Sequence, residues 1–326
     1  MKQKVLYCTL RVKESAAWGG RIEDKMTIQE EIKQLKEEKD AVILAHYYVE
    51  PEVQAIADYI GDSFYLSKIA AGLPNRILVY CGVSFMGESG CMLSPEKQVL
   101  MPDAAADCPM AHMVTREEVD EARRTYEDLA VVCYINSTAE IKSWADVCVT
   151  SANAVSIVRN LPNKNILFIP DKNLGRFVAE QVPEKNVLLV KGYCPIHEAI
   201  QVQELKKLAE EHPEAEILVH PECRSEVIRI ADYVGSTSGI IKYATASEKK
   251  EFIIGTETGV RYELERQNPG KQFYFPETEP VCRDMKLITL EKVLHVLKTG
   301  ENRASVNPEQ AEAAGRTLTR MLELAK

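Results

Sequence analysis

The chain has 326 residues, of which 45% are hydrophobic and 27% charged, and its formal net charge is -9. This composition is ordinary for a globular protein with room for two or three compact cores. The negative charge and the lack of a basic run argue against a nucleic-acid or membrane surface, and no apolar stretch is long enough to span a bilayer. Because the N-terminus has no secretory leader pattern, we expect a cytoplasmic protein whose partners are small molecules.

The N-terminal part of the chain divides into two predicted segments. Residues 1–25 show no clear periodicity and are predicted to be an appended or disordered extension. After Thr27, the apolar residues Ile28, Ile32 and Leu35 recur at helical spacing, with charged residues between them. This pattern predicts a helix that leads into the first of three similar segments.

Three passages of the sequence, 41–63, 129–151 and 215–237, align without a gap. The repeat is about 87 residues long, whereas solenoid units run to roughly 20 to 50 residues, so we expect three small domains around a pseudo-threefold axis. The predicted limits are 1–25 for the extension, 26–114, 115–203 and 204–288 for the three repeat domains, and 289–326 for a C-terminal helical tail.

Each repeat opens with a short apolar run, 42–45 in the first copy, which is typical of a central parallel strand. A helix with an acidic first turn follows, then a second short strand, and the alternation of helix and strand continues to a fourth strand. This order predicts an α/β fold with parallel sheets, helices on both faces and right-handed crossovers. We expect three homologous αβα domains with one active site at the centre.

Polar residues recur at equivalent positions, all at the predicted carboxyl ends of strands, where parallel α/β sheets bind ligands. Hydroxyl residues that open the second helix of each repeat are predicted N-caps, and such helix N-termini also bind anions. Three aspartates before the second strand are predicted to be structural: Asp58, Asp146 and Asp232. The residues expected to converge are His46, Tyr134 and His220, then Tyr48, Asn136 and Glu222, and the hydroxyl residues Ser63, Ser151 and Thr237.

Three of the nine cysteines, Cys108, Cys194 and Cys282, occupy equivalent positions after the last strand of each repeat. No CxxC pair is present, so a metal site would be assembled from distant segments. Proline follows Cys108 and Cys194, and we expect a helix start there whose dipole favours the thiolate. The other cysteines are predicted to be structural: Cys8, Cys81, Cys91, Cys133, Cys148 and Cys223.

A site of three thiolates has two interpretations. It can hold zinc with an open position, with His112 or His197 as a fourth ligand, or a 4Fe-4S cluster with one iron not bound by protein. One ligand from each of three domains favours the cluster, whose free iron would act as a Lewis acid. The histidines, tyrosines and Glu222 beside it are the groups that general acid-base catalysis needs.

Several motifs resemble the bacterial quinolinate synthase family over residues 27–326. They are LAHYY, ADYIGDS, FMGES followed by SPEK, YINS, GYCPIH, HPEC, GTETG and CRDMKLITLEKV. The resemblance implies an enzyme of NAD biosynthesis that condenses iminoaspartate with dihydroxyacetone phosphate to quinolinate, releasing phosphate and water. It further implies a 4Fe-4S cluster on the three equivalent cysteines, and L-aspartate oxidase or a related dehydrogenase as the source of iminoaspartate.

The same resemblance implies roles for individual residues. Glu222 and Tyr48 would transfer protons, and His220 and Tyr134 would act at the reacting centre by orienting the substrate. The hydroxyl residues and Asn136 would hold carboxylate or phosphate groups. The residues implied to line the substrate cavity are His46, Ser63, Tyr134, Ile135, Asn136, Ser151, His220, Pro221, Glu222 and Thr237.

Two alternatives remain at this point: a non-catalytic metal-dependent sensor, and a zinc hydrolase that uses three thiolates. A sensor has no need for histidine, tyrosine and glutamate beside the metal, so their placement argues against it.

Overall fold

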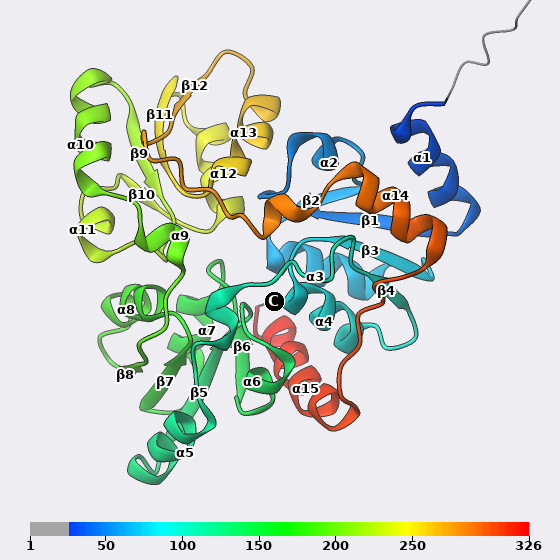
Figure 1. The fold of residues 1–326 in the computed structure, drawn as a ribbon. Helices are drawn as coiled ribbons and strands as arrows, with labels where there is room; N and C mark the ends of the chain where they lie inside the picture. Colours follow the sequence, from blue (N-terminus) through cyan, green and yellow to red (C-terminus); the bar gives the residue numbers. More distant parts are fainter. Residues whose placement is uncertain (1–25, 326) are drawn as a thin grey trace, which may run out of the picture.

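The computed structural model describes residues 26–325, and the extension predicted for 1–25 lies outside the described residues. In the described part, the strands form three four-stranded sheets in which every pairing is parallel. Figure 1 shows three units, each a sheet with its helices, arranged around a common centre. The predicted α/β class, with three αβα units about a pseudo-threefold axis, is confirmed.

The three sheets share one strand order, β2-β1-β3-β4, β6-β5-β7-β8 and β10-β9-β11-β12. The first strand of each unit is therefore central, and all residues of β1 and β5 are buried. Burial on both faces explains why these runs are continuously apolar. The strands are β1 Ala41–His46, β2 Tyr59–Gly61, β3 Ile77–Cys81, β4 Gln98–Leu100, β5 Leu129–Tyr134, β6 Val147–Val149, β7 Asn165–Ile169, β8 Asn186–Leu189, β9 Glu216–Val219, β10 Tyr233–Val234, β11 Glu251–Gly255 and β12 Gln272–Tyr274.

Helices alternate with the strands. The helices that follow the N-cap residues Thr27 and Thr115 begin with capping boxes. No helix in the described range is both long and apolar enough to cross a bilayer. The α-helices are α1 Ile28–Glu38, α2 Pro51–Ala55, α3 Ser63–Gly72, α4 Ser84–Leu93, α5 Arg116–Thr125, α6 Ala139–Ser143, α7 Ala154–Asn160, α8 Lys172–Gln181, α9 Pro195–Glu198, α10 Val202–Glu211, α11 Ser225–Ile228, α12 Thr237–Ala246, α13 Arg261–Gln267, α14 Leu290–Thr299 and α15 Pro308–Leu324; the 3₁₀ helices are η1 Pro109–His112, η2 Thr258–Val260 and η3 Met285–Leu287.

The three repeated aspartates have the structural role that was predicted. Asp58, Asp146 and Asp232 each accept a hydrogen bond from a backbone N–H of the central first strand, at 2.8, 2.7 and 2.8 Å. Each carboxylate thereby joins the segment before the second strand to the first strand. A carboxylate bound to a backbone N–H makes a charge-assisted bond, which is stronger than a neutral one.

A lysine at an equivalent position in each unit binds carbonyl oxygens at or near the C-terminal end of a helix. Lys97 Nζ lies 2.9 Å from the carbonyl oxygen of Ala70, and Lys185 and Lys271 bind carbonyl groups just beyond α7 and α12 at 2.8 and 2.7 Å. A cation at a helix C-terminus satisfies carbonyl groups that have no partner within the helix.

The N-cap prediction for the three hydroxyl residues was wrong. The caps of α3 and α12 are the preceding residues Asp62 and Ser236, whose side chains accept N–H groups of the first turn. In the second unit the helix begins only at Ala154. Aspartate and serine are equally good caps, so sequence alone does not decide between neighbouring candidates. Ser63 and Thr237 are instead the first residues of their helices, with hydroxyl groups available to the centre.

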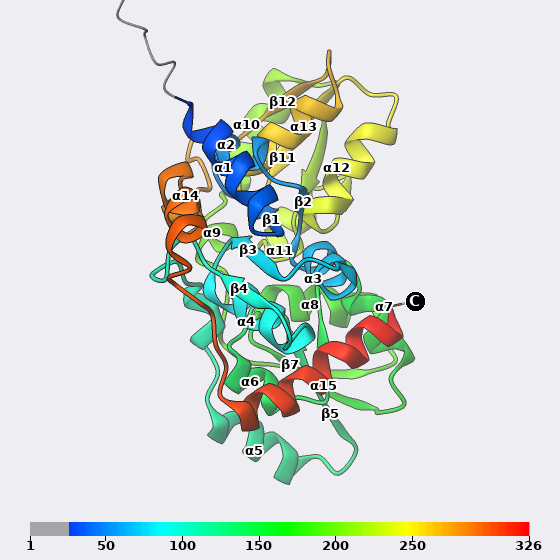
Figure 2. The same ribbon diagram turned by 90° about the vertical axis from the view of Figure 1, so that its right-hand side faces the viewer.

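The C-terminal helices tie the first two units together. Helix α14 packs on α1, whereas α15 contacts α4 of the first unit and both α6 and β6 of the second. Figure 2 shows α15 lying across this junction. The apolar residues of the first two units form one continuous core, and the third unit has two smaller clusters, one of which includes Tyr47 of the first unit.

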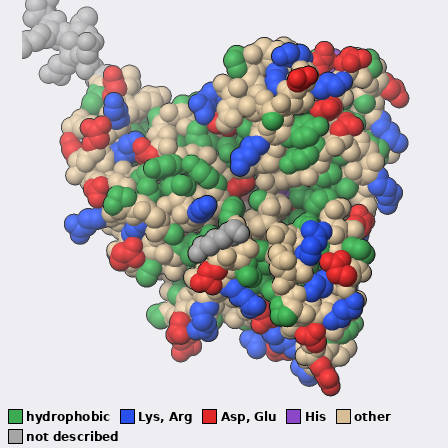
Figure 3. Space-filling view, turned by 180° about the vertical axis from the view of Figure 1, so that it is seen from behind, with side chains coloured by type: hydrophobic (Ala, Val, Ile, Leu, Met, Phe, Trp, Pro, Cys, Tyr) green, Lys and Arg blue, Asp and Glu red, His purple; other side chains and the backbone are tan. Residues whose placement is uncertain are grey.

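The outer surface mixes charges of both signs. On the face shown in Figure 3, lysine and arginine side chains are interspersed with acidic ones, with hydrophobic side chains between them.

Candidate active site

A cavity of about 260 Å³ lies where the carboxyl ends of the three sheets meet. Residues from all three units line it, which follows from the equivalent placement of their strand ends. Among the residues predicted for catalysis, substrate binding and the three-cysteine site, only Pro221, between His220 and Glu222, is absent from the lining. The predicted residues that do line it are His46, Tyr48, Ser63, Cys108, Tyr134, Ile135, Asn136, Ser151, Cys194, His220, Glu222, Thr237 and Cys282.

The three equivalent cysteines reach this cavity from three loops. Cys108 directly precedes η1, Cys194 directly precedes α9, and Cys282 lies beyond β12. All three are unbridged, and none of the other described cysteines lines the cavity. One soft sulfur ligand from each unit therefore faces a shared space.

Burial decides the protonation of these thiols. It raises the pKa of Cys282 to about 11 and the pKa values of Cys108 and Cys194 further still. The expectation that the helix starts at Cys108 and Cys194 favour thiolate was therefore wrong for the metal-free protein. Desolvation of the charged form outweighs one short helix end, so deprotonation has to accompany the binding of a cation.

Glu222 lies beside two stacked histidines. Its Oε2 is 2.6 Å from His197 Nδ1 and 3.8 Å from His220 Nδ1, and the two rings stack with centroids 4.5 Å apart. Burial acts to raise the pKa of Glu222, but the contact with His197 and a hydrogen bond from Tyr134 outweigh it and hold this pKa below its usual range. The carboxylate is therefore charged in a buried site.

The tautomers of the predicted site histidines follow from their backbone contacts. The N–H of Tyr48 donates to His46 Nδ1 at 3.2 Å, and the N–H of Glu222 donates to His220 Nδ1 at 3.3 Å. Burial lowers the pKa of His46 to about 4 and that of His220 to about 3, so both rings are neutral near pH 7. Each neutral ring then carries its hydrogen on Nε2, and His220 Nε2 lies 3.3 Å from the Ser151 hydroxyl.

A series of hydrogen bonds crosses the cavity wall from the first unit to Glu222. The Tyr48 hydroxyl lies 2.7 Å from the Thr237 hydroxyl and 3.0 Å from the Thr256 hydroxyl. Thr256 in turn lies 2.9 Å from His197 Nε2, and His197 Nδ1 contacts Glu222. Hydroxyl and imidazole groups both donate and accept, so this series can pass a proton between Tyr48 and Glu222.

Sequence reasoning missed two members of this series. Thr256 stands where the other repeats have Gly82 and Pro170, and His197 stands where they have Ala111 and Met285. A search for polar residues shared by the repeats cannot find them. The only signal in the sequence is their presence in the motifs GTETG and GYCPIH, and the zinc interpretation gives His197 a role as a ligand alone.

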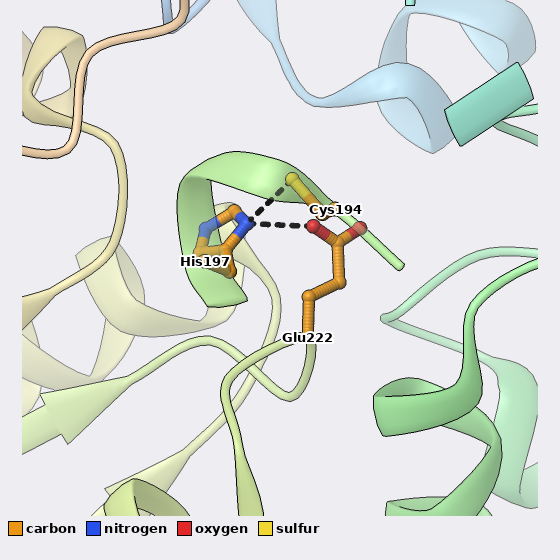
Figure 4. A group of neighbouring side chains, drawn as sticks. All are labelled: Cys194, His197 and Glu222. Carbon is orange, nitrogen blue, oxygen red and sulfur yellow. Dashed lines mark hydrogen bonds and ion pairs between the residues drawn. The ribbon is translucent and has the colours of Figure 1, made fainter. Parts of the chain in front are cut away.

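Cys194, His197 and Glu222 form a group that could bind a metal ion. One donor atom from each lies within 4.8 Å of the others, and Figure 4 shows the three side chains pointing toward one another. The other histidine proposed for zinc, His112, is half-exposed, absent from the cavity lining and paired with Asp107 at 2.6 Å. A mixed sulfur, nitrogen and oxygen set of this kind is compatible with zinc.

The cavity also contains polar groups without a protein partner. The side-chain oxygen of Asn136 and the hydroxyl of Thr150 are buried and accept or donate no hydrogen bond, and Arg283 adds a positive charge to the lining. Buried polar atoms are rarely left unpaired. The Asn136 oxygen can accept a hydrogen bond from a polar ligand, whereas the Thr150 hydroxyl and Arg283 can donate to one.

The fold and the cavity together define a class of protein. It is a three-unit α/β protein in which three thiols and a buried acid-base pair line one cavity, an arrangement typical of enzymes. The family described as Quinolinate synthetase A protein matches residues 30–323. The chain belongs to this family, as the motifs had predicted.

Proteins named quinolinate synthase resemble the chain over nearly its whole length. That of Caldicellulosiruptor saccharolyticus is 50% identical over 91% of this chain and 98% of its own length, and that of Clostridioides difficile is 51% identical over 91% and 97%. The relative from Aquifex aeolicus is 47% identical over 93% of this chain and 96% of its own. These names support an enzyme.

Proposed function

We propose that the protein is a quinolinate synthase, a transferase that condenses iminoaspartate with dihydroxyacetone phosphate to quinolinate, with loss of phosphate and water. It would serve NAD biosynthesis in the cytoplasm and receive iminoaspartate from L-aspartate oxidase or a related dehydrogenase. The observation that carries this proposal is the meeting of three cysteines, one from each unit, in the same cavity as Glu222 and its histidines.

The residues present fit a 4Fe-4S cluster. Three thiols line the cavity, the described lining offers no fourth, and a cluster bound by three cysteines keeps one iron for substrate. The cluster would supply a Lewis acid for a hydroxyl or carboxylate group. Cys108, Cys194 and Cys282 would hold it.

The protein's own residues would bind the substrates and move protons. The unpaired Asn136 oxygen and the hydroxyl groups of Ser63, Ser151 and Thr237 would bind polar groups of the substrates. Glu222, charged and buried, would act as the general base.

The proton that Glu222 takes up would travel to Tyr48 along the series of hydrogen bonds described above. His197 and Thr256 would pass the proton to Tyr48, whose hydroxyl would act as the acid. His220 and Tyr134, which flank Glu222, would orient the substrate.

A zinc enzyme is the second candidate, and the geometry of Cys194, His197 and Glu222 favours it. The two candidates use the cysteines differently. A cluster needs Cys108, Cys194 and Cys282 equally, whereas zinc on this group needs only Cys194.

Anaerobic iron, sulfide and zinc analysis separates the candidates, applied to the wild type and to Cys108→Ala, Cys194→Ala and Cys282→Ala. We expect about four irons and a brown protein in the wild type, with loss of iron in each variant. A protein that takes up one zinc and no iron, and retains zinc in Cys108→Ala and Cys282→Ala, would instead establish the zinc enzyme.

A further inference from the structure

Two buried carboxylates hold the loops that carry Cys194 and Cys282. Asp171 and Glu257 occupy equivalent positions after β7 and β11, and both are fully buried. Asp171 Oδ2 accepts the backbone N–H of Cys194 at 3.0 Å, and Glu257 Oε1 accepts that of Cys282 at 3.1 Å. The same kind of bond is therefore made twice at equivalent places.

The second oxygen of each carboxylate binds the start of the next helix. Asp171 Oδ1 accepts two N–H groups in the first turn of α8, at 2.9 and 2.7 Å, and Glu257 Oε2 accepts the N–H of Gly259 in η2 at 2.6 Å. Each side chain thus connects a helix N-terminus at the sheet end to the cysteine loop. We call this connection the carboxylate tether.

In the first unit, the carboxylate of the tether stands in the cysteine loop instead of at the start of the helix. The residue at the equivalent position is Val83, which has no acceptor. Asp107 instead stands in the cysteine loop, where its Oδ1 accepts the N–H of Cys108 at 2.8 Å and a hydrogen bond from the hydroxyl of Ser84, the first residue of α4. The loop and the helix start are joined again, although the carboxylate now comes from the loop.

We propose that Asp107, Asp171 and Glu257 are positioning residues for the iron-sulfur cluster. They fix the backbone of each ligand cysteine, so that the three thiols converge before any metal binds. This inference rests on the proposed function. The bonds to the N–H groups of Cys108, Cys194 and Cys282 are 2.8, 3.0 and 3.1 Å long. Groups that orient a metal ligand typically contribute tenfold to a hundredfold to metal affinity.

Asp171→Asn tests the tether without removing the helix cap. Asparagine caps a helix as well as aspartate does, so its oxygen can still serve α8, while its NH₂ group then faces the N–H of Cys194. Asp146→Asn is the control, because Asp146 lies in the same unit and also accepts a backbone N–H, that of Val131, while its other side-chain partner is Arg123. Glu257→Gln repeats the test in the third unit.

The experiment compares anaerobically reconstituted proteins by the rate of iron release to a chelator, well below their unfolding temperatures. We expect Asp171→Asn and Glu257→Gln to release iron about 10 to 100 times faster than the wild type, and Asp146→Asn to release it at the wild-type rate. In the metal-free proteins, we expect alkylation of Cys194 to be faster in Asp171→Asn only.

Two results would overturn the inference: iron release from Asp171→Asn at the wild-type rate, or acceleration matched by Asp146→Asn. The second result would mean that loss of fold stability explains the effect. A wild-type protein that binds no iron would refute the proposed function itself, and the alkylation comparison would still report on the tether.

Discussion

Glu222 Oε2 and His197 Nδ1 are 2.6 Å apart, and only about 3% of either side chain is exposed. The pair comes from two segments, the loop after β9 and helix α9, that meet only in the folded chain. The contact with His197 keeps the Glu222 carboxylate ionised, so this buried group is able to accept a proton.

Removing that charge is the first test of the mechanism. We expect Glu222→Gln to lower kcat by about 10² to 10⁴ with iron content unchanged, because glutamine keeps the shape but accepts no proton. Single-turnover assays of the reconstituted enzyme measure this. Glu263→Gln is the matched control, since Glu263 is also buried but pairs with Arg266 outside the cavity. An equal loss in both variants would contradict the assignment.

Thr256 tests the hydrogen-bonded series. Thr256→Val keeps the volume and removes the hydroxyl between Tyr48 and His197, and we expect activity to fall by about tenfold or more. Thr256→Ser, which retains the hydroxyl, should keep most of the activity. Similar rates for Thr256→Val and Thr256→Ser would show that no proton passes through this residue.

Acid should destabilise the metal-free protein. The pKa values of His46 and His220 are lowered by burial to about 4 and about 3, from a usual value of 6.5. Between these values the unfolded chain binds protons that the folded chain does not, so the free energy of unfolding rises with pH across this window. Each histidine contributes at most about 1.4 kcal/mol per pH unit. Urea denaturation between pH 4 and 7 checks the slope, and stability that falls with rising pH would contradict it.

Gly259 tests the contact between the third and first units. A Cβ at this position would lie 2.7 Å from Tyr48 Cα and 2.8 Å from the carbonyl oxygen of Tyr47, and backbone atoms cannot easily move aside. We therefore expect Gly259→Ala to displace Tyr48 and to reduce activity. Gly72→Ala is the control, because a Cβ there meets no atom within 4 Å. Crystal structures and activity of the two variants would show whether the displacement occurs.

Sequence alone predicted the parts of the site that the repeats share. Cys108, Cys194 and Cys282 line one cavity because equal positions in equal folds reach the same centre. Thr256 and His197 could not be found in this way, since their equivalents in the other repeats are not polar. The family resemblance supplied the roles that geometry alone leaves open.

The sequence also could not predict which of two neighbouring residues caps a helix, or whether burial or a helix end controls the pKa of a thiol. Asp62 and Ser63 can both cap a helix, and only the folded backbone shows that Asp62 does so. The thiol pKa values depended on the balance between burial and a helix end, and burial dominated.

The reversed tether of the first unit bears on the history of the chain. Three copies of one ancestral segment would have begun with the same residue at positions 83, 171 and 257. The first copy now has valine there, yet its cysteine loop is still joined to its helix start, through Asp107. The three copies thus make the same connection with different residues, so relatives should be compared by whether each cysteine loop is joined to its helix start rather than by identity at any one position.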